Sequence, residues 1–146
     1  MKIERFEDIK AWQEARVLVG MVYAAVGADR GFGSDFGFRE QIQGAAVSVM
    51  SNIAEGFSRR STKEFTQFLF IAKGSAAEVQ SQLYVAFDRD YIDQQKLDEL
   101  YSKSDEIARL ISGFIRYLLN KGKPHALNQS NKLSEPKQLK KLNKLQ

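Results

Sequence analysis

Three basic side chains stand close together in the sequence, at Arg59, Arg60 and Lys63. Guanidinium and ammonium groups bind phosphate, and each one placed on a nucleic-acid phosphate releases a bound counterion. The cluster therefore indicates contact with a nucleic-acid backbone. The alternative is that the three are solvated residues of a turn, and the pattern alone does not choose between the two.

A second set of basic residues lies near the C-terminus. Residues 121–146 hold seven Lys and one acidic residue, Glu135, and so carry +6. Residues 1–120 hold 15 basic and 17 acidic residues and carry −2, so the net charge of +4 comes from the C-terminal segment. We expect this segment to be a mobile electrostatic arm for nucleic acid. The lysines that it would use are Lys132, Lys137, Lys140, Lys141 and Lys144.

Four polar residues share one arc of a predicted helix: Gln41, Ser48, Asn52 and Glu55. Residues three, four and seven apart lie on the same side of a helix. The row is typical of hydrogen bonding between helices, which is the interpretation that we favour, and the alternative is contact with a ligand or nucleic acid. Glu55 also stands one turn before Arg59, where the two would form a surface ion pair of small energetic value.

An apolar stripe that a bundle core does not need runs through Phe70, Ala77 and Tyr84, spaced seven residues apart. It lies opposite the core-facing side of its predicted helix, and a helix that is apolar on both sides is usually buried on both sides. We therefore expect the stripe to be the interface of a homo-oligomer. The alternative is an exposed aromatic or cover by the C-terminal tail.

Catalytic side chains are scarce. His125 is the only histidine and there is no cysteine. A Ser-His-Asp triad lacks a base in the folded body, and the paired Glu-x-x-His motifs of a di-iron bundle are missing. No glycine-rich phosphate loop occurs. A carboxylate-only magnesium site is left open, but no cluster indicates one. We expect a protein that is not an enzyme and that has no metal site and no cofactor.

Long helices must position these residues. The two prolines, Pro124 and Pro136, lie near the C-terminus, and the first 120 residues have none. Apolar residues recur there at three- and four-residue spacing, which predicts helices. Gly122 and Pro124 should end the last one. The expected helices begin near residues 8, 35, 61 and 93, and the first two extend to about residues 26 and 56.

Local signals mark the helix ends. The glycine-rich segment 27–34 should break the chain between the first two helices. Asp35 and Asp93 are predicted N-caps, and Ser61-Thr-Lys-Glu64 has the spacing of a capping box. Gly56 should end the second helix as its C-terminal cap.

The predicted core faces include Tyr23 in the first helix and Tyr101 in the last. Helices of this length with short connections pack as neighbours that run in alternating directions. The sequence thus predicts an all-α, antiparallel, up-down-up-down four-helix bundle over residues 1–120, followed by a basic, Lys-rich C-terminal tail over residues 121–146.

Membrane and export signals are not evident. The N-terminal residues lack the apolar core of a signal peptide, and no apolar run reaches the roughly 20 residues of a membrane span. The absence of cysteine fits a reducing compartment. We expect a soluble, cytoplasmic protein.

Residues 45–87 resemble the signature of the "four helix bundle protein" family, also called the 23S rRNA intervening-sequence protein family. The motifs that carry the resemblance are Asn-Ile-Ala-Glu-Gly at 52–56, Lys-Glu-Phe at 63–65 and the pair Gly74-Ser75. Residues 6–15 are similar to the start of the family's first helix, and residues 90–92 are similar to the turn before its fourth helix. The resemblance implies a four-helix bundle. Through relatives that accompany diversity-generating retroelements, it also implies a ring-shaped pentamer that binds RNA or DNA through basic surfaces.

Together these features predict a non-catalytic, homo-oligomeric accessory protein that binds nucleic acid. Its partners would be further copies of itself and RNA or DNA, with no membrane. The alternative is a protein–protein scaffold or adaptor that docks a partner enzyme such as a reverse transcriptase.

Overall fold

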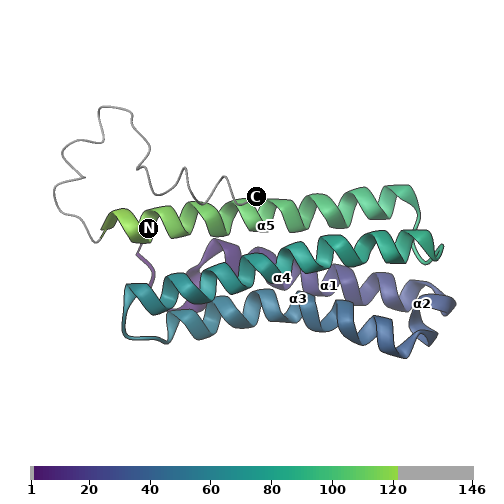
Figure 1. Ribbon diagram of the computed structural model, residues 1–146, viewed down its shortest axis with the longest axis horizontal. Helices are drawn as coiled ribbons and strands as arrows, with labels where there is room; N and C mark the ends of the chain where they lie inside the picture. The colour runs from purple at the N-terminus through teal and green to yellow at the C-terminus, as the bar shows by residue number, and fades with distance from the viewer. Residues whose placement is uncertain (1, 122–146) are drawn as a thin grey trace.

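The computed structural model describes residues 2–121, and all secondary-structure elements in this part of the chain are helices. A short 3₁₀ helix, η1 (Phe6–Asp8), leads into α1 (Lys10–Ala28). The short α2 (Arg30–Ser34) connects α1 to α3 (Phe36–Phe57), which is followed by α4 (Thr62–Asp88) and α5 (Gln94–Lys121). Figure 1 shows the four long helices side by side, each running opposite to the one before it. The prediction of an antiparallel four-helix bundle is confirmed.

The core lies on the central axis between the four long helices. Each helix contributes apolar side chains at three- and four-residue spacing, as the sequence pattern predicted. Among the largest fully buried side chains are Leu18, Ile42, Ile53, Leu69, Leu83, Leu100, Ile107 and Ile111. Two hydrogen bonds made by serine hydroxyl groups also join helices of the bundle. The Ser104 hydroxyl on α5 donates to the carbonyl of Ala76 on α4 at 2.9 Å, and the hydroxyls of Ser48 and Ser75 lie 2.9 Å apart.

The segment between α1 and α3 differs from the prediction. Residues 27–34 do not simply break the chain, because they contain α2, whose Phe32 is only 1% exposed. The Phe32 ring stacks on Tyr91 and on Phe38, with ring centres 5.1 and 5.7 Å away. The Tyr91 hydroxyl donates to the Asp35 carboxylate at 2.8 Å, which raises the pKa of Tyr91. The glycines thus allow a tight connection, and Phe32 packs it onto this end of the bundle.

Most helix ends follow the local signals. The Asp35 carboxylate accepts from the backbone N–H of Phe38 at 3.4 Å, and that of Asp93 accepts from Lys96 at 2.8 Å. The Ser61 hydroxyl accepts from the N–H of Glu64 at 3.2 Å. In each case a side-chain oxygen satisfies a backbone donor that the first turn leaves free.

The prediction for Gly56 was wrong. Gly56 lies inside the last turn of α3, is buried, and does not have the positive φ of a C-terminal cap. A Cβ atom at this position would lie 2.7 Å from the Cβ of Phe68 and 2.8 Å from Cδ2 of Phe65. The glycine is therefore needed for close contact between α3 and α4.

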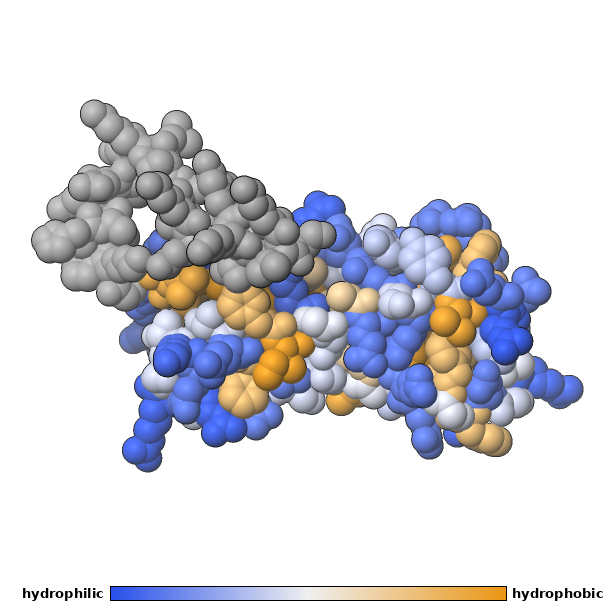
Figure 2. All heavy atoms as spheres, in the orientation of Figure 1, coloured by the Kyte–Doolittle hydropathy of each residue, from blue (hydrophilic) through white to orange (hydrophobic). Residues whose placement is uncertain are grey.

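Two tyrosines predicted for the core lie at the surface instead. Tyr23 is 51% exposed and Tyr101 is 36% exposed, because each stands at the margin of the apolar face of its helix. On the side of the molecule seen in Figure 2, apolar surface gathers in two areas, one toward each end of the bundle, with polar surface between them. Apolar groups are thus distributed over the surface as well as the core.

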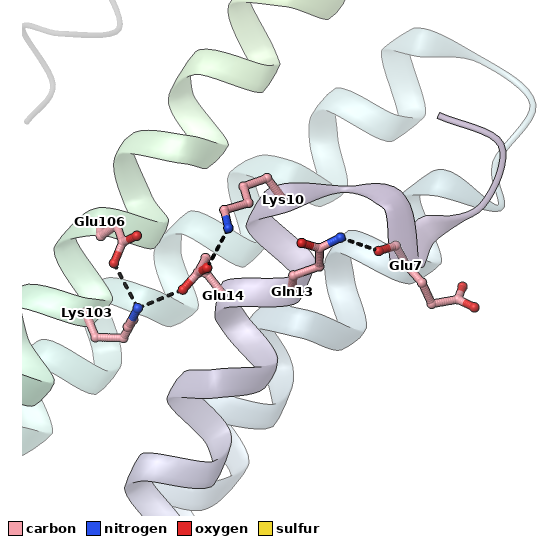
Figure 3. A network of polar contacts seen from close by, with 6 residues as sticks. All are labelled: Glu7, Lys10, Gln13, Glu14, Lys103 and Glu106. Atoms are coloured by element: carbon pink, nitrogen blue, oxygen red, sulfur yellow. Dashed lines mark hydrogen bonds and ion pairs between the residues drawn. The ribbon is translucent and has the colours of Figure 1, made fainter. Parts of the chain in front are cut away.

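An ion-pair network joins α1 to α5 (Figure 3). The Glu14 carboxylate accepts from Lys103 of α5 at 2.7 Å and from Lys10 at 2.9 Å, and Lys103 also donates to Glu106 at 3.0 Å. The Gln13 side chain donates to the backbone carbonyl of Glu7 at 2.8 Å, which ties the first residues to α1. Glu14 and Lys103 are largely shielded from solvent, with side chains 15% and 21% exposed.

This network predicts a pH dependence. Hydrogen bonds from Lys103 and then Lys10 hold the pKa of Glu14 below its ordinary value of 4.5. A carboxylate with a lowered folded-state pKa stabilises the fold above its unfolded pKa, and this stabilisation is lost as the pH falls through the folded pKa. We expect wild type to be more stable than Glu14→Gln at neutral pH, with the difference shrinking below about pH 4.5. Urea unfolding of both proteins at several pH values measures this difference in stability. A difference that stays constant down to pH 3 would contradict a lowered pKa of Glu14 in the folded state.

Among residues 2–121, no helix is long and apolar enough to cross a membrane.

Candidate nucleic-acid interface

The turn between α3 and α4 holds the three basic residues that the sequence singled out. Arg59 is engaged within the protein, since it pairs with Glu55 at 3.0 Å and its guanidinium lies 4.8 Å from the centre of the Phe68 ring. Arg60 and Lys63 are exposed, and no carboxylate of the described chain lies within 4 Å of either. The turn therefore presents two cations that are free to meet an anion, with Arg59 held beside them.

A groove between α4 and α5 contains basic residues that the sequence analysis missed. It has a volume of about 750 Å³ and is lined by Lys73 of α4 and by Arg109 and Arg116 of α5, together with Phe70 and Ala77. Arg109 forms an ion pair with Asp105, the acidic residue that lines the same groove. Lys73 and Arg116 have no carboxylate within 4 Å in the part of the chain that the structure describes.

Lys73 and Arg116 are close enough to affect each other. Partial burial, and then the positive charge of Arg116, lower the pKa of the Lys73 ammonium group. Two cations that share a partly desolvated groove without an acidic partner repel each other, and an anion placed between them would remove that repulsion. The groove is therefore suited to bind a phosphate.

The turn and the groove lie toward the same end of the bundle. The Phe65 ring contacts the Phe114 ring at 5.4 Å between centres, so the start of α4 packs against the last turns of α5. Lys63 therefore lies level with Arg116, and Figure 1 places the α3–α4 turn and the end of α5 at one end of the molecule. Spacing within either helix does not reveal this arrangement, because it depends on the register between the two helices.

The predicted polar row does not form one continuous network. Asn52 donates to the carbonyl and the hydroxyl of Ser48 at 2.8 and 2.9 Å, and Ser48 contacts Ser75 of α4. Glu55 pairs with Arg59 instead of Asn52, and Gln41 lies exposed at the other end of α3. The geometry of Ser48 and Asn52 fits the interhelical alternative, and a role in ligand binding stays a prediction.

The apolar stripe of α4 is exposed, as its position on the helix predicted. Phe70 is 37% and Tyr84 is 52% exposed, and Ala77 lies between them on the same face. Ile71 and Val85, one residue further along in each case, are exposed as well. Phe70 and Ala77 line the basic groove, whereas Tyr84 packs edge-on against Tyr101 at 6.0 Å. The assignment of this face to an oligomer interface stays a prediction.

Within residues 2–121 no group of three or more His, Cys, Asp or Glu residues could hold a metal ion. His125 and the lysines predicted to contact nucleic acid from the tail (Lys132, Lys137, Lys140, Lys141 and Lys144) lie outside the described residues. The absence of enzyme activity and of a cofactor therefore stays a prediction.

Comparison with known proteins places these features in context. The sequence profile of the 23S rRNA-intervening sequence protein family matches residues 7–113. The comparison with curated proteins gives no match. Among solved structures, the chain is similar to the crystal structure of a protein of unknown function from the S23 ribosomal protein family of Bacteroides thetaiotaomicron VPI-5482. The two share 21% sequence identity with a TM-score of 0.65, over 72% of this chain and 97% of that one. At this identity the likeness shows a common fold.

Proposed function

This chain belongs to the 23S rRNA-intervening sequence protein family. From the surface of its bundle we propose that it is a non-catalytic accessory protein that binds RNA or DNA as a homo-oligomer. The observation that carries the proposal is the pair Lys73 and Arg116, two cations in one groove without an acidic partner among the described residues. Arg60 and Lys63 extend this basic surface toward the α3–α4 turn.

The chemistry favours backbone contact over base recognition. Phosphate contacts by Lys and Arg supply sequence-independent affinity, and sequence reading requires side chains placed against base edges. The groove is lined by the cations Lys73, Arg109 and Arg116, and the one aromatic ring in its lining is that of Phe70. We therefore propose binding that depends on salt and varies little with sequence.

Self-association would multiply this contact. The exposed apolar face of α4, comprising Phe70, Ile71, Ala77, Tyr84 and Val85, is the surface that we assign to it. Because Phe70 and Ala77 also line the groove, Lys73 and Arg116 would lie along each boundary between subunits. A closed assembly would then repeat the same weak phosphate site around its circumference, and linked weak sites bind much more tightly than one.

A salt titration tests the nucleic-acid proposal. Lys73→Gln combined with Arg116→Gln should weaken binding to generic RNA and DNA and flatten the log–log salt dependence. Each lost phosphate contact lowers that slope by about 0.9 for duplex DNA and about 0.7 for a single strand, so two lost contacts lower it by about 1.4–1.8. Fluorescence anisotropy at several salt concentrations measures the slope.

The matched control removes the same charge at the other end of the bundle. Arg30→Gln combined with Arg89→Gln changes two exposed arginines that begin α2 and follow α4, and the salt slope should stay close to that of wild type. If both variants lose the same affinity and the same salt slope, net charge alone drives binding and the groove has no special role. If the intact protein binds neither RNA nor DNA at low salt, the proposal is wrong and the scaffold alternative replaces it.

A further inference from the structure

A second groove, on the neighbouring face of α5 and sharing Asp105 and Arg109 with the first, has a different character. It has a volume of about 950 Å³ and lies between the N-terminal residues with the start of α1 and the outer face of α5. Its apolar lining includes Ile3, Ile9, Leu110 and Phe114. Tyr101 and Tyr117 stand at its two ends along α5, and Tyr117 is 52% exposed. The groove thus offers an apolar strip that no described part of the chain covers.

The charged rim of this groove is slightly acidic. Asp8, Asp105 and Glu106 line it together with Lys10 and Arg109, which gives three acids and two bases. The groove between α4 and α5 has the opposite balance, with Lys73, Arg109 and Arg116 against one acid, Asp105. A basic apolar segment would therefore be attracted to the first groove and repelled by the second.

The chain itself contains a segment of this chemistry. Residues 137–146, Lys-Gln-Leu-Lys-Lys-Leu-Asn-Lys-Leu-Gln, hold four Lys and no acidic residue. At about 100° per residue, Leu139, Leu142 and Leu145 fall within one arc of a helical wheel, and the four lysines fall within the arc opposite. Pro136 precedes them, at a place where proline suits the first turn of a helix. The pattern is that of an amphipathic helix with one apolar face.

The connection is long enough to bring this segment to the groove. The groove is lined by α5 residues from Tyr101 to Tyr117, and α5 extends to Lys121, one turn beyond. Residues 122–136 lie between, and a chain of that length spans up to about 50 Å when extended. A ten-residue helix is about 15 Å long, and the stretch of α5 from Tyr101 to Tyr117 is about 24 Å long. The segment therefore fits the groove in both reach and length.

We propose that residues 137–146 dock as a helix into the groove between α1 and α5 of the same chain, with Leu139, Leu142 and Leu145 against Leu110 and Phe114. Docking covers apolar surface that the described residues leave open and sets the basic segment against the acidic rim. This inference stands independently of nucleic-acid binding.

Cysteine cross-linking tests the docking, because the chain has no cysteine of its own. Gly113 lines the groove, and a Cβ atom built there meets no atom of another helix within 4 Å, so Gly113→Cys introduces a thiol without a clash. In the full-length chain that carries Gly113→Cys and Leu142→Cys, a disulfide should form within one chain under mild oxidation. Two tethered sites that do not interact also meet at a finite rate, so the rate must be compared with a control.

Gly74→Cys with Leu142→Cys is the matched control, since Gly74 lines the groove between α4 and α5 and its Cβ atom is equally unobstructed. We expect the disulfide of the Gly113→Cys, Leu142→Cys variant to form at least about tenfold faster than that of the control. Adding Leu139→Asp and Leu145→Asp should remove this difference in rate without changing any residue of the bundle. Equal rates for the two glycine positions would overturn the proposal. A disulfide that links two chains in preference to one would overturn it as well, because the occupant would then be a second copy.

Discussion

Replacing Gly56 by alanine is expected to lower the free energy of unfolding by about 3 kcal/mol, at the upper end of the range for overpacked sites. The added Cβ atom would lie 2.7 Å from the Cβ of Phe68 and 2.8 Å from Cδ2 of Phe65. The contact with Phe68 cannot be relieved by moving the tip of a flexible side chain, because the Cβ of Phe68 is fixed to the backbone of α4. The helices α3 and α4 must therefore move apart at this point.

Two other glycines provide the control. A Cβ atom at Gly44 of α3 or at Gly74 of α4 meets no atom within 4 Å. Alanine is favoured over glycine in a helix by about 1 kcal/mol, so Gly44→Ala and Gly74→Ala should stabilise the protein slightly. Urea unfolding followed by circular dichroism measures all three variants. If Gly56→Ala is as stable as wild type, α3 and α4 do not pack as closely at Gly56 as described above.

Tyr84→Glu is expected to break the assembly into smaller species that remain helical. The substitution places a carboxylate in the apolar face of α4, where assembly would have to desolvate it without a cation nearby. Tyr84 is a better site for the charge than Phe70, because Lys73 and Arg116 line the groove beside Phe70 and would neutralise a carboxylate there. Beside Tyr84, the adjoining groove is lined by Asp88 and Asp98.

Tyr23→Glu is the matched control for this experiment. Tyr23 is exposed to a similar extent, 51% against 52% for Tyr84, but lies on α1. It should leave the mass of the assembly unchanged, as measured by light scattering, and both variants should keep the helical content of wild type. A wild-type protein that is monomeric at micromolar concentration would refute the proposed self-association altogether.

The helical architecture was predictable because its signals are local. Asp35, Ser61 and Asp93 each cap a helix through a backbone group three residues away, so the sequence alone specifies where those helices begin. The core faces follow from helical periodicity in the same way. The exposed face of α4 was also predictable, since Phe70 and Tyr84 stand opposite the buried residues of their own helix.

The remaining features depend on contacts between segments that are distant in sequence. Phe32 is buried because Tyr91, from the connection between α4 and α5, packs against it. Gly56 is required because Phe65 and Phe68 approach it from α4. The placement of Lys73 close to Arg116 depends on the register of α4 against α5. Sequence spacing within one helix carries no information about these three arrangements.

The packing of Phe32 has a consequence for how the sequence can diverge. At that end of the bundle, the connection between α1 and α3 is held by stacked rings and by the hydrogen bond from Tyr91 to Asp35. Insertions or polar replacements there would disrupt buried contacts and destabilise the fold. At the opposite end, residues 58–61 between α3 and α4 are exposed, and exposed loops tolerate substitution and changes of length. Residues 58–61 can therefore acquire new charges over evolutionary time, while the contacts of Phe32 and Tyr91 keep the connection between α1 and α3 in place.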